Sequence, residues 1–283
     1  MRPAGRRSVV RRLRANWPAY AAEAFLLGAF MISAAAFGTL LEYSGSPARI
    51  HLVNADVRRA LMGLAMCGTL VALVYSPPGG RSGAHLSPAV TLVFYRLGKV
   101  SGIDAAMYVA AQCVGAVGGI QAAAAVIGVP LAAPGVRYVA TVPGPQGSGV
   151  AFAAEVVIAF LQMTAVLEFS NRPRLSRWTG VAAGALLALY ITVESPLSGT
   201  SLNAARSLGS AWPAGEIRTL WIYVLAPAAG MLLAAGAYVR AHGPRRVFCA
   251  KLHHPSGVPC PFHCRHDEMS ATLGSSHAVQ HTL

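Results

Sequence analysis

Charged side chains are scarce in this sequence of 283 residues. Only 12% of them are Asp, Glu, Lys or Arg, against about 25% in an ordinary soluble domain. The few charges lie in the gaps between long apolar runs. This pattern indicates a protein that crosses a membrane several times rather than one soluble core. No nucleophile–base constellation and no nucleotide-binding loop is found in the sequence, so a soluble enzyme is excluded and no catalytic residue is assigned.

Acidic residues are the rarer of the charged kinds, with 10 Asp and Glu against 23 Lys and Arg. In a soluble protein this excess would indicate nucleic acid as a partner. Here the charges instead report orientation in the membrane, and we expect no nucleic-acid partner. A signal-peptide pattern is also lacking, because the apolar run after the basic N-terminal arm (residues 1–18) is too long and has no convincing cleavage site.

Six apolar runs are present, each close to the ~20 residues that cross ~30 Å of hydrocarbon as a helix. The second and the fifth are the shortest, at 17 residues each. The predicted spans are 19–41, 60–76, 104–128, 150–169, 178–194 and 216–239.

Two further apolar stretches, 83–97 and 199–209, are too short to span and are marked by Gly, Pro and Ser. Such segments at matching places in two halves predict re-entrant half-helices, whose irregular backbone must line a cavity or be buried in protein. With three spans per half, the second copy is inserted upside down. We therefore expect an all-α membrane protein with six transmembrane helices and two half-helices in an inverted repeat, over about 19–128 and 150–240.

Basic residues are distributed unevenly between the two sides of this arrangement. They concentrate in residues 2–14, 81–99, 172–177 and 240–265, which share one side. The positive-inside rule then predicts cytoplasmic termini, including a cytoplasmic tail over 241–283. The Pro/Gly-rich connection 129–149 becomes an outer loop across the two halves.

The half-helix starts carry the candidate chemistry. Helix N-termini present free N–H groups and a positive end, and two facing ends form a barrier to cations and protons. Asn203 is suited to cap the second half-helix and aim an amide donor at the pore, and Ser87 is suited to cap the first with its hydroxyl. Pro88 fits the first turn of a helix, and Ala204 is its counterpart.

Three charged side chains are expected at membrane depth. Arg206 lies one turn beyond Asn203 and should face a wet cavity, held by backbone carbonyls, where it repels cations and donates hydrogen bonds. The alternative for Arg206 is a side chain that snorkels at a helix end. Glu23 and Glu155 occupy equivalent repeat positions. We expect each to accept N–H bonds from the loop before its half-helix, with a proton relay as the alternative.

His85 lies two residues before Ser87. We expect it to hydrogen-bond backbone near the pore rather than to bind a metal, because no second ligand is near it in sequence.

These motifs resemble those of the major intrinsic protein (aquaporin) family. The resemblance runs from about 19 to 240 and rests on AEAFLLGAF, SGAHLSPAVTL, AQCVGAVGG, AEVVIAFLQ, SGTSLNAARSLGSAW and Pro227 in the sixth span. It implies a multi-pass channel in a plasma or bacterial inner membrane, in contact with the lipid bilayer, that passes water or small neutral solutes. It also implies a homotetramer with one pore per subunit and no required cofactor.

The sequence departs from the family pattern at both half-helix tips. Where the family has Asn-Pro-Ala twice, this chain has Ser87-Pro88-Ala89 and Asn203-Ala204-Ala205. These changes predict less fixed donor geometry at the midplane. The resemblance assigns the selectivity constriction to Arg206, Thr200, Ile191 and either Met66 or Cys67. The span-five His of strict water channels is missing, and so is the Asp that follows the Arg in glycerol-type members, which predicts a wider, less polar aperture.

The tail holds seven Cys and His side chains between 249 and 266, a set that suits Zn²⁺ or Cu(I). The alternative is a flexible tail without metal. The candidate ligands are Cys249, His253, His254, Cys260, His263, Cys264 and His266.

Three functions stay open at this point. The first is a passive channel for water and small neutral solutes. The second is a facilitator mainly for glycerol, hydrogen peroxide, urea or ammonia. The third is a metal-responsive membrane protein gated through its Cys/His tail.

Overall fold

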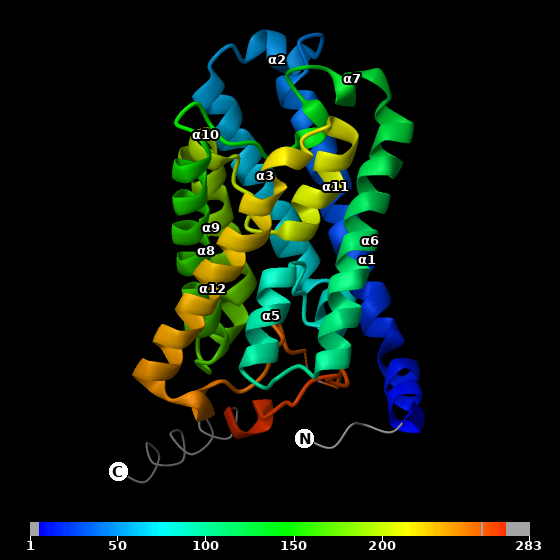
Figure 1. Ribbon diagram of the computed structural model, residues 1–283, viewed down its shortest axis with the longest axis vertical. Coiled ribbons are helices and arrows are strands. Elements are labelled where there is room, and N and C mark those ends of the chain that lie inside the picture. Colours follow the sequence, from blue (N-terminus) through cyan, green and yellow to red (C-terminus); the bar gives the residue numbers. More distant parts are fainter. Residues whose placement is uncertain (1–5, 256, 270–283) are drawn as a thin grey trace, which may run out of the picture.

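The computed structural model describes residues 6–255 and 257–269, and in those residues the regular structure is helical, without strands. Within them six helices are long and apolar enough to cross a membrane, as predicted. They run side by side (Figure 1). These helices are α1 (Arg6–Glu42), α3 (Ala55–Tyr75), α6 (Gly102–Ile127), α8 (Ser148–Ser170), α9 (Thr179–Val193) and α12 (Leu220–His242).

Short helices connect and complete the six spans. Two of them, α5 (Pro88–Arg96) and α11 (Ala204–Ala214), are the expected half-helices. The others are α2 (Pro47–His51), α4 (Pro77–Ser82), α7 (Val129–Ala132) and α10 (Ser195–Ser198), with 3-10 turns at Arg137–Val139, Ser176–Trp178, Ile217–Thr219 and Pro244–Arg246. We call the end that carries the start of α1 and the tail the terminal end, and the end that carries α2 and α7 the distal end (Figure 1).

Most of the basic N-terminal arm belongs to the first helix. Its residues 6–18 are helical and continuous with the first span. The physical reason is Asp104 at the start of α6, whose carboxylate accepts hydrogen bonds from Arg12 (2.7 Å), Asn16 (2.9 Å) and Tyr20 (2.6 Å). These three side chains lie at helical spacing, so docking on Asp104 holds the arm in helical form.

Glycines allow the long helices of each half to pack closely. A Cβ on Gly119 of α6 would lie 2.4 Å from the Gly28 carbonyl oxygen of α1, and a Cβ on Gly230 of α12 would lie 2.3 Å from the Val156 carbonyl oxygen of α8. No side chain fits at such a distance, so both helix pairs require glycine at these positions. The same close contact therefore recurs in both halves.

The loops before the half-helices repeat the same backbone path. A short helix, α4 or α10, ends at a left-handed glycine, Gly83 (φ 92°) or Gly199 (φ 84°). Positive φ angles then follow at Ala84 and Leu86 in one loop and at the equivalent Thr200 and Leu202 in the other. α5 and α11 start near the centre of the molecule and run toward opposite ends (Figure 1). This arrangement is the inverted repeat expected from the sequence.

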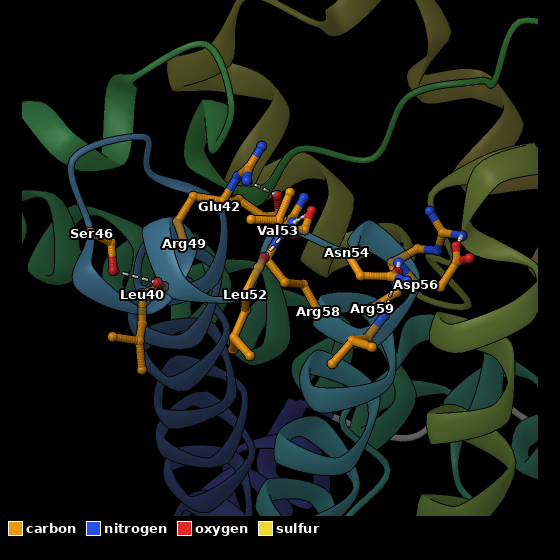
Figure 2. A network of polar contacts seen from close by, with 11 residues as sticks. Leu40, Glu42, Ser46, Arg49, Leu52, Val53, Asn54, Asp56, Arg58 and Arg59 are labelled. Atoms are coloured by element: carbon orange, nitrogen blue, oxygen red, sulfur yellow. Dashed lines mark hydrogen bonds and ion pairs between the residues drawn. The ribbon is translucent and has the colours of Figure 1, made fainter.

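At the distal end, a buried arginine fixes the connection between α1 and α3 (Figure 2). Arg58 donates to the carbonyl oxygens of Leu52 and Val53, both at 2.7 Å, and to the Glu42 carboxylate at 3.1 Å. Asn54 caps α3 through Asp56 and Val57. The connection is thereby held at the rim of the distal opening.

The long connection 129–149 crosses between the two halves. Gly144 donates its backbone N–H to the Leu197 carbonyl oxygen at 2.9 Å, and the Thr141 and Ser207 hydroxyls are 2.6 Å apart. The connection therefore contacts the second half-helix directly, as its predicted position across the halves requires.

Candidate functional site

Two cavities follow one another between the distal end and the half-helix tips. The distal cavity, of about 210 Å³, is lined by the end of α1, the first half of α3 and residues within 135–140. The inner cavity, of about 90 Å³, reaches both half-helix tips and ends at Leu252 of the tail. They share four lining residues, Phe30, Leu187, Ser201 and Arg206. We call the two cavities together the central passage, with Arg206 at their junction.

Asn203 caps the second half-helix. Its Oδ1 accepts from the backbone N–H groups of Ala205 (3.1 Å) and Arg206 (3.2 Å), and its Nδ2 donates to the Leu86 carbonyl oxygen at 2.5 Å. The amide donor that the sequence indicated for the pore is thus engaged by the other half of the protein. Ala204 begins α11, and Ala205 is buried beside it.

Ser87 does not cap the first half-helix, contrary to the expectation. It occupies the N-cap position before Pro88 and the buried Ala89, but its hydroxyl makes no side-chain cap bond. Instead it donates to the Leu202 carbonyl oxygen at 3.2 Å. The reason is geometric, because the opposing loop brings this carbonyl within reach of the short serine side chain.

The two tips are therefore joined by a reciprocal pair of hydrogen bonds. Ser87 donates to the residue before Asn203, and Asn203 donates to the residue before Ser87. The asparagine makes the two contacts with separate atoms, whereas the single Ser87 oxygen, placed to reach Leu202, accepts no N–H of its own helix. In consequence the first turn of α5 keeps N–H groups without a side-chain cap.

Glu23 and Glu155 hold the loops that precede the two half-helices, as expected. Glu23 accepts from the backbone N–H groups of His85 (3.0 Å) and Leu86 (2.8 Å). Glu155 accepts from those of Ser201 (2.5 Å) and Leu202 (2.9 Å). Both carboxylates are fully buried. This bonding supports the structural role rather than the proton relay.

Arg206 lies on the wall of the central passage. Its Nη1 nitrogen is buried and has no hydrogen-bond partner among the described residues. The expected bonds from its guanidinium to backbone carbonyls are not found in that part of the chain. A buried donor without a partner is costly, so Arg206 presents a hydrogen-bond donor to whatever enters the passage.

Three of the four other constriction candidates line the passage, and one does not. Thr200, Ile191 and Met66 line the distal cavity with Arg206. Thr200 donates its hydroxyl to the Glu194 carboxylate at 2.6 Å. Cys67 does not line either cavity and instead packs against Gly184 of α9. Of the two span-two candidates, the geometry therefore retains Met66.

Sequence reasoning missed Met62 and Ser195, which also line the distal cavity. Met62 precedes Met66 by four residues, so helical periodicity could have found it. Ser195 had no comparable signal, because its position depends on the short helix α10.

His85 does bond to backbone, but the backbone belongs to the tail. Its Nε2 lies 2.9 Å from the Ala250 carbonyl oxygen, and its Nδ1 lies 3.1 Å from the Thr91 hydroxyl. Phe262 of the tail stacks on the same ring, with centroids 5.2 Å apart. His85 thus connects the first half-helix with the tail.

Four of the seven tail residues form one cluster. The ligand atoms of Cys249, His254, Cys260 and Cys264 all lie within 4.8 Å of one another. The other three expected ligands are outside the cluster, which corrects the prediction. His253 packs against Tyr75, His263 Nδ1 lies 3.0 Å from the Gly98 carbonyl oxygen, and His266 stacks on His254.

The thiols of this cluster form a hydrogen-bonded set. Cys249 and Cys260 have their sulfurs 3.5 Å apart, and Cys264 Sγ lies 3.3 Å from His254 Nε2. The hydrogen bond from Cys249 lowers the pKa of Cys260 and that of Cys264 below the usual thiol value, and the same bonds raise the pKa of Cys249. Two of the three sulfurs are therefore favoured as thiolates, the form that binds metal.

The donor set fits a thiophilic metal ion. Three sulfurs and one imidazole are a common tetrahedral zinc set, and two sulfurs on Zn²⁺ at about 2.3 Å would lie about 3.8 Å apart. The observed separation of 3.5 Å between Cys249 and Cys260 is near that value and far beyond a disulfide bond of about 2.05 Å. The cluster has the spacing of ligands around one ion.

Known proteins are similar to this chain in sequence. The model of the family described as "Major intrinsic protein" matches residues 11–238. Aquaporin NIP6-1 of Arabidopsis thaliana is 35% identical over 204 residues, which cover 71% of this chain and 65% of that protein. The chain thus spans just under two thirds of the length of this plant relative. Glycerol uptake facilitator protein-like 6 of Lactiplantibacillus plantarum is 35% identical over 202 residues, covering 70% of this chain and 91% of that protein.

A solved structure has the same fold. The aquaglyceroporin from Plasmodium falciparum superimposes with a TM-score of 0.64 at 16% identity, over 82% of this chain and 98% of the other. The six membrane-spanning helices and the two half-helices lie within or close to the residues 11–238 that the family model matches. The chain belongs to the major intrinsic protein family.

Proposed function

We propose that the protein is a passive channel for water and small neutral solutes through the central passage. The observation that carries the proposal is the junction at Arg206, where two half-helix N-termini meet and two cavities adjoin. Both ends present positive potential, and Arg206 adds a full charge. This field opposes cations and protons, while neutral molecules are not repelled by it.

The lining of the constriction favours small polar solutes over water alone. Ile191 and Met66 contribute apolar surface, and Thr200 and Arg206 contribute polar groups. A lining that combines apolar surface with hydrogen-bond donors suits a small polyol, which has both a carbon backbone and hydroxyl groups. The bacterial relative is named as a glycerol uptake facilitator. We therefore propose glycerol-sized neutral solutes as cargo beside water.

The topology and assembly follow from charge and family. We propose that the terminal end is cytoplasmic, because most of the 23 Lys and Arg residues belong to segments at that end. We also propose a homotetramer with one passage per subunit, supported by membership in the family. Cross-linking in native membranes tests the assembly, and it should give a band of four subunits. Antibody labelling tests the topology, because an antibody against the tail should bind only after the cells are permeabilised.

We further propose that the cluster of Cys249, His254, Cys260 and Cys264 binds one Zn²⁺ or Cu(I) ion. Three sulfur ligands suit either metal, and His254 completes a tetrahedron for zinc. Metal analysis of the purified protein is expected to give one ion per chain. The Cys260→Ser/Cys264→Ser variant is expected to bind none, and Cys113→Ser, which alters a thiol outside the cluster, should bind as wild type does.

Stopped-flow light scattering of proteoliposomes tests the channel itself. Osmotic shrinkage in an impermeant sugar reports water, and reswelling after a glycerol gradient reports the solute. We expect both rates to exceed those of empty liposomes in at least one of two states of the protein, metal-loaded or metal-depleted. If no water and no neutral solute moves faster than through lipid alone under either condition, the channel proposal is wrong.

Ser87→Asn is expected to restore a side-chain cap on α5 without breaking the contact between the tips. Asparagine can accept from the first-turn N–H groups and still donate to the Leu202 carbonyl oxygen, as Asn203 does in the other half. A cap of this kind contributes about 1 kcal/mol. We expect slower proton leak with water flux kept or raised, measured with a pH-sensitive dye in the same liposomes. An unchanged leak would mean that Ser87 already excludes protons as well as asparagine does.

A further inference from the structure

The terminal end of the central passage is covered by the protein's own tail. Residues 250–252 cross beneath the inner cavity, and Leu252 forms part of its lining. Ala250, Lys251 and Leu252 are 0%, 3% and 6% exposed. Residues that follow the last span as a polar tail are rarely buried to this degree. The segment therefore occupies the place where solutes would leave or enter.

Three hydrogen bonds fasten this segment to the loop that leads into α5. Leu252 donates its backbone N–H to the Gly83 carbonyl oxygen at 3.0 Å, and Lys251 Nζ donates to that of Gly80 at 2.7 Å. His85 Nε2 lies 2.9 Å from the Ala250 carbonyl oxygen. The tail thus contacts the pore loop itself rather than the lipid-facing surface of the helices.

The candidate metal ligands flank the covering segment. Cys249 precedes it and His254 follows it, while Cys260 and Cys264 come from the returning part of the tail. That returning part is itself attached to the protein. His263 donates its backbone N–H to the Lys99 carbonyl oxygen at 2.9 Å, and Phe262 stacks on His85. A metal ion would therefore link both ends of the covering segment to the attached, returning part of the tail.

We propose that metal binding to this cluster closes the channel at its terminal end by holding residues 250–252 over the inner cavity, and that metal loss opens it. The proposal rests on the proposed channel and metal site and adds their coupling. The four ligands meet only while the tail is folded beneath the passage, so the ion stabilises that arrangement over any in which the tail leaves. A ligand shifts an equilibrium by its difference in affinity for the two states.

The first test compares wild-type protein in two metal states. Protein is loaded with one equivalent of Zn²⁺ before reconstitution, and a membrane-permeant zinc chelator is added to half of the liposomes. We expect water and glycerol rates to rise about tenfold after chelation, within the range typical of coupled sites. A second readout is cleavage by trypsin after Lys251, which should be slow with Zn²⁺ and fast without it, because the buried residue becomes accessible only when the tail leaves.

Three full-length variants locate the effect. Cys260→Ser/Cys264→Ser should show the high rate with or without Zn²⁺, and Cys113→Ser should respond as wild type does. Leu252→Ala should still bind one Zn²⁺ but lose much of the closure, because a smaller side chain covers the inner cavity. Should the cysteine variant fail to fold, the chelation series on wild-type protein still decides the question.

The outcomes separate this proposal from the two on which it rests. Stoichiometric zinc binding with equal flux before and after chelation would overturn the closure and leave the metal site standing. Flux above empty liposomes without any zinc binding would overturn both closure and metal site but leave the channel. A metal-dependent flux that Leu252→Ala does not alter would also contradict the proposal, since the closure would then lie elsewhere. Absence of flux in every state would overturn the channel and the closure together.

Discussion

Replacing Glu155 with alanine is expected to destabilise the second half of the protein strongly. The change removes the acceptor for the backbone N–H groups of Ser201 and Leu202 and for the Ser198 hydroxyl. All three donors are buried, and each buried donor without a partner costs about 1–3 kcal/mol. The loss of two backbone bonds alone thus amounts to roughly 2–6 kcal/mol, a large part of the total stability of an ordinary domain.

Thermal unfolding in detergent, followed by light scattering and intrinsic fluorescence, measures this loss. Glu155→Gln should fall between wild type and Glu155→Ala, because the amide keeps one acceptor oxygen but turns a donor toward the remaining N–H group. Glu168→Ala is the matched control on the same helix, where the carboxylate is partly exposed and paired with Arg172 and His242. Equal midpoints for Glu155→Ala and the Glu168 control would contradict the structural role.

The features that could be predicted are those that depend on local pattern. Hydropathy located the six spans, because crossing a membrane imposes a length and a composition on each segment independently. Two apolar stretches too short to span, each marked by Gly, Pro or Ser, located the half-helices. The roles of Glu23 and Glu155 followed from one rule, that a buried carboxylate at membrane depth needs donors and that a loop before a half-helix has free N–H groups.

The features that could not be predicted depend on contacts between distant segments. Whether Ser87 caps its own helix or reaches the Leu202 carbonyl depends on the approach of a loop more than a hundred residues away. The choice between Met66 and Cys67 depends on the rotation of α3 about its axis, and neighbouring residues on a helix point about 100° apart.

The tail was the least predictable part of the chain. Its composition indicated metal ligands, but seven candidates allow many sets of four. Packing of the tail under the passage selects among them, because His253 packs against Tyr75 and His263 hydrogen-bonds to the Gly98 carbonyl oxygen. The helical arm at 6–18 is a similar case, since only Asp104 of a different span holds it.

Replacing Arg206 with valine is expected to change what the passage admits more than any other single change. The substitution removes the one positive charge at the junction of the two cavities, and with it the buried Nη1 donor. At an effective dielectric constant of about 20, repulsion between this charge and a cation about 8 Å away is roughly 2 kcal/mol, equivalent to about a 30-fold change in rate. We expect proton and small-cation leak to rise by about that factor, while glycerol passes at least as fast through the wider opening.

Dye-reported proton leak and stopped-flow glycerol uptake are measured on the same chelator-treated liposomes. The proton leak reports the effect of the Arg206 charge, and the glycerol uptake reports the width of the opening. Arg206→Lys keeps the charge but presents a single flexible ammonium group, so it should retain most of the cation barrier. Arg218→Val is the control. It removes the same charge from an exposed arginine that lines neither cavity. If Arg206→Val and Arg218→Val leak protons equally slowly, the barrier comes from the half-helix ends alone. The uncapped N–H groups of α5 and the capped ones of α11 would then carry the whole exclusion.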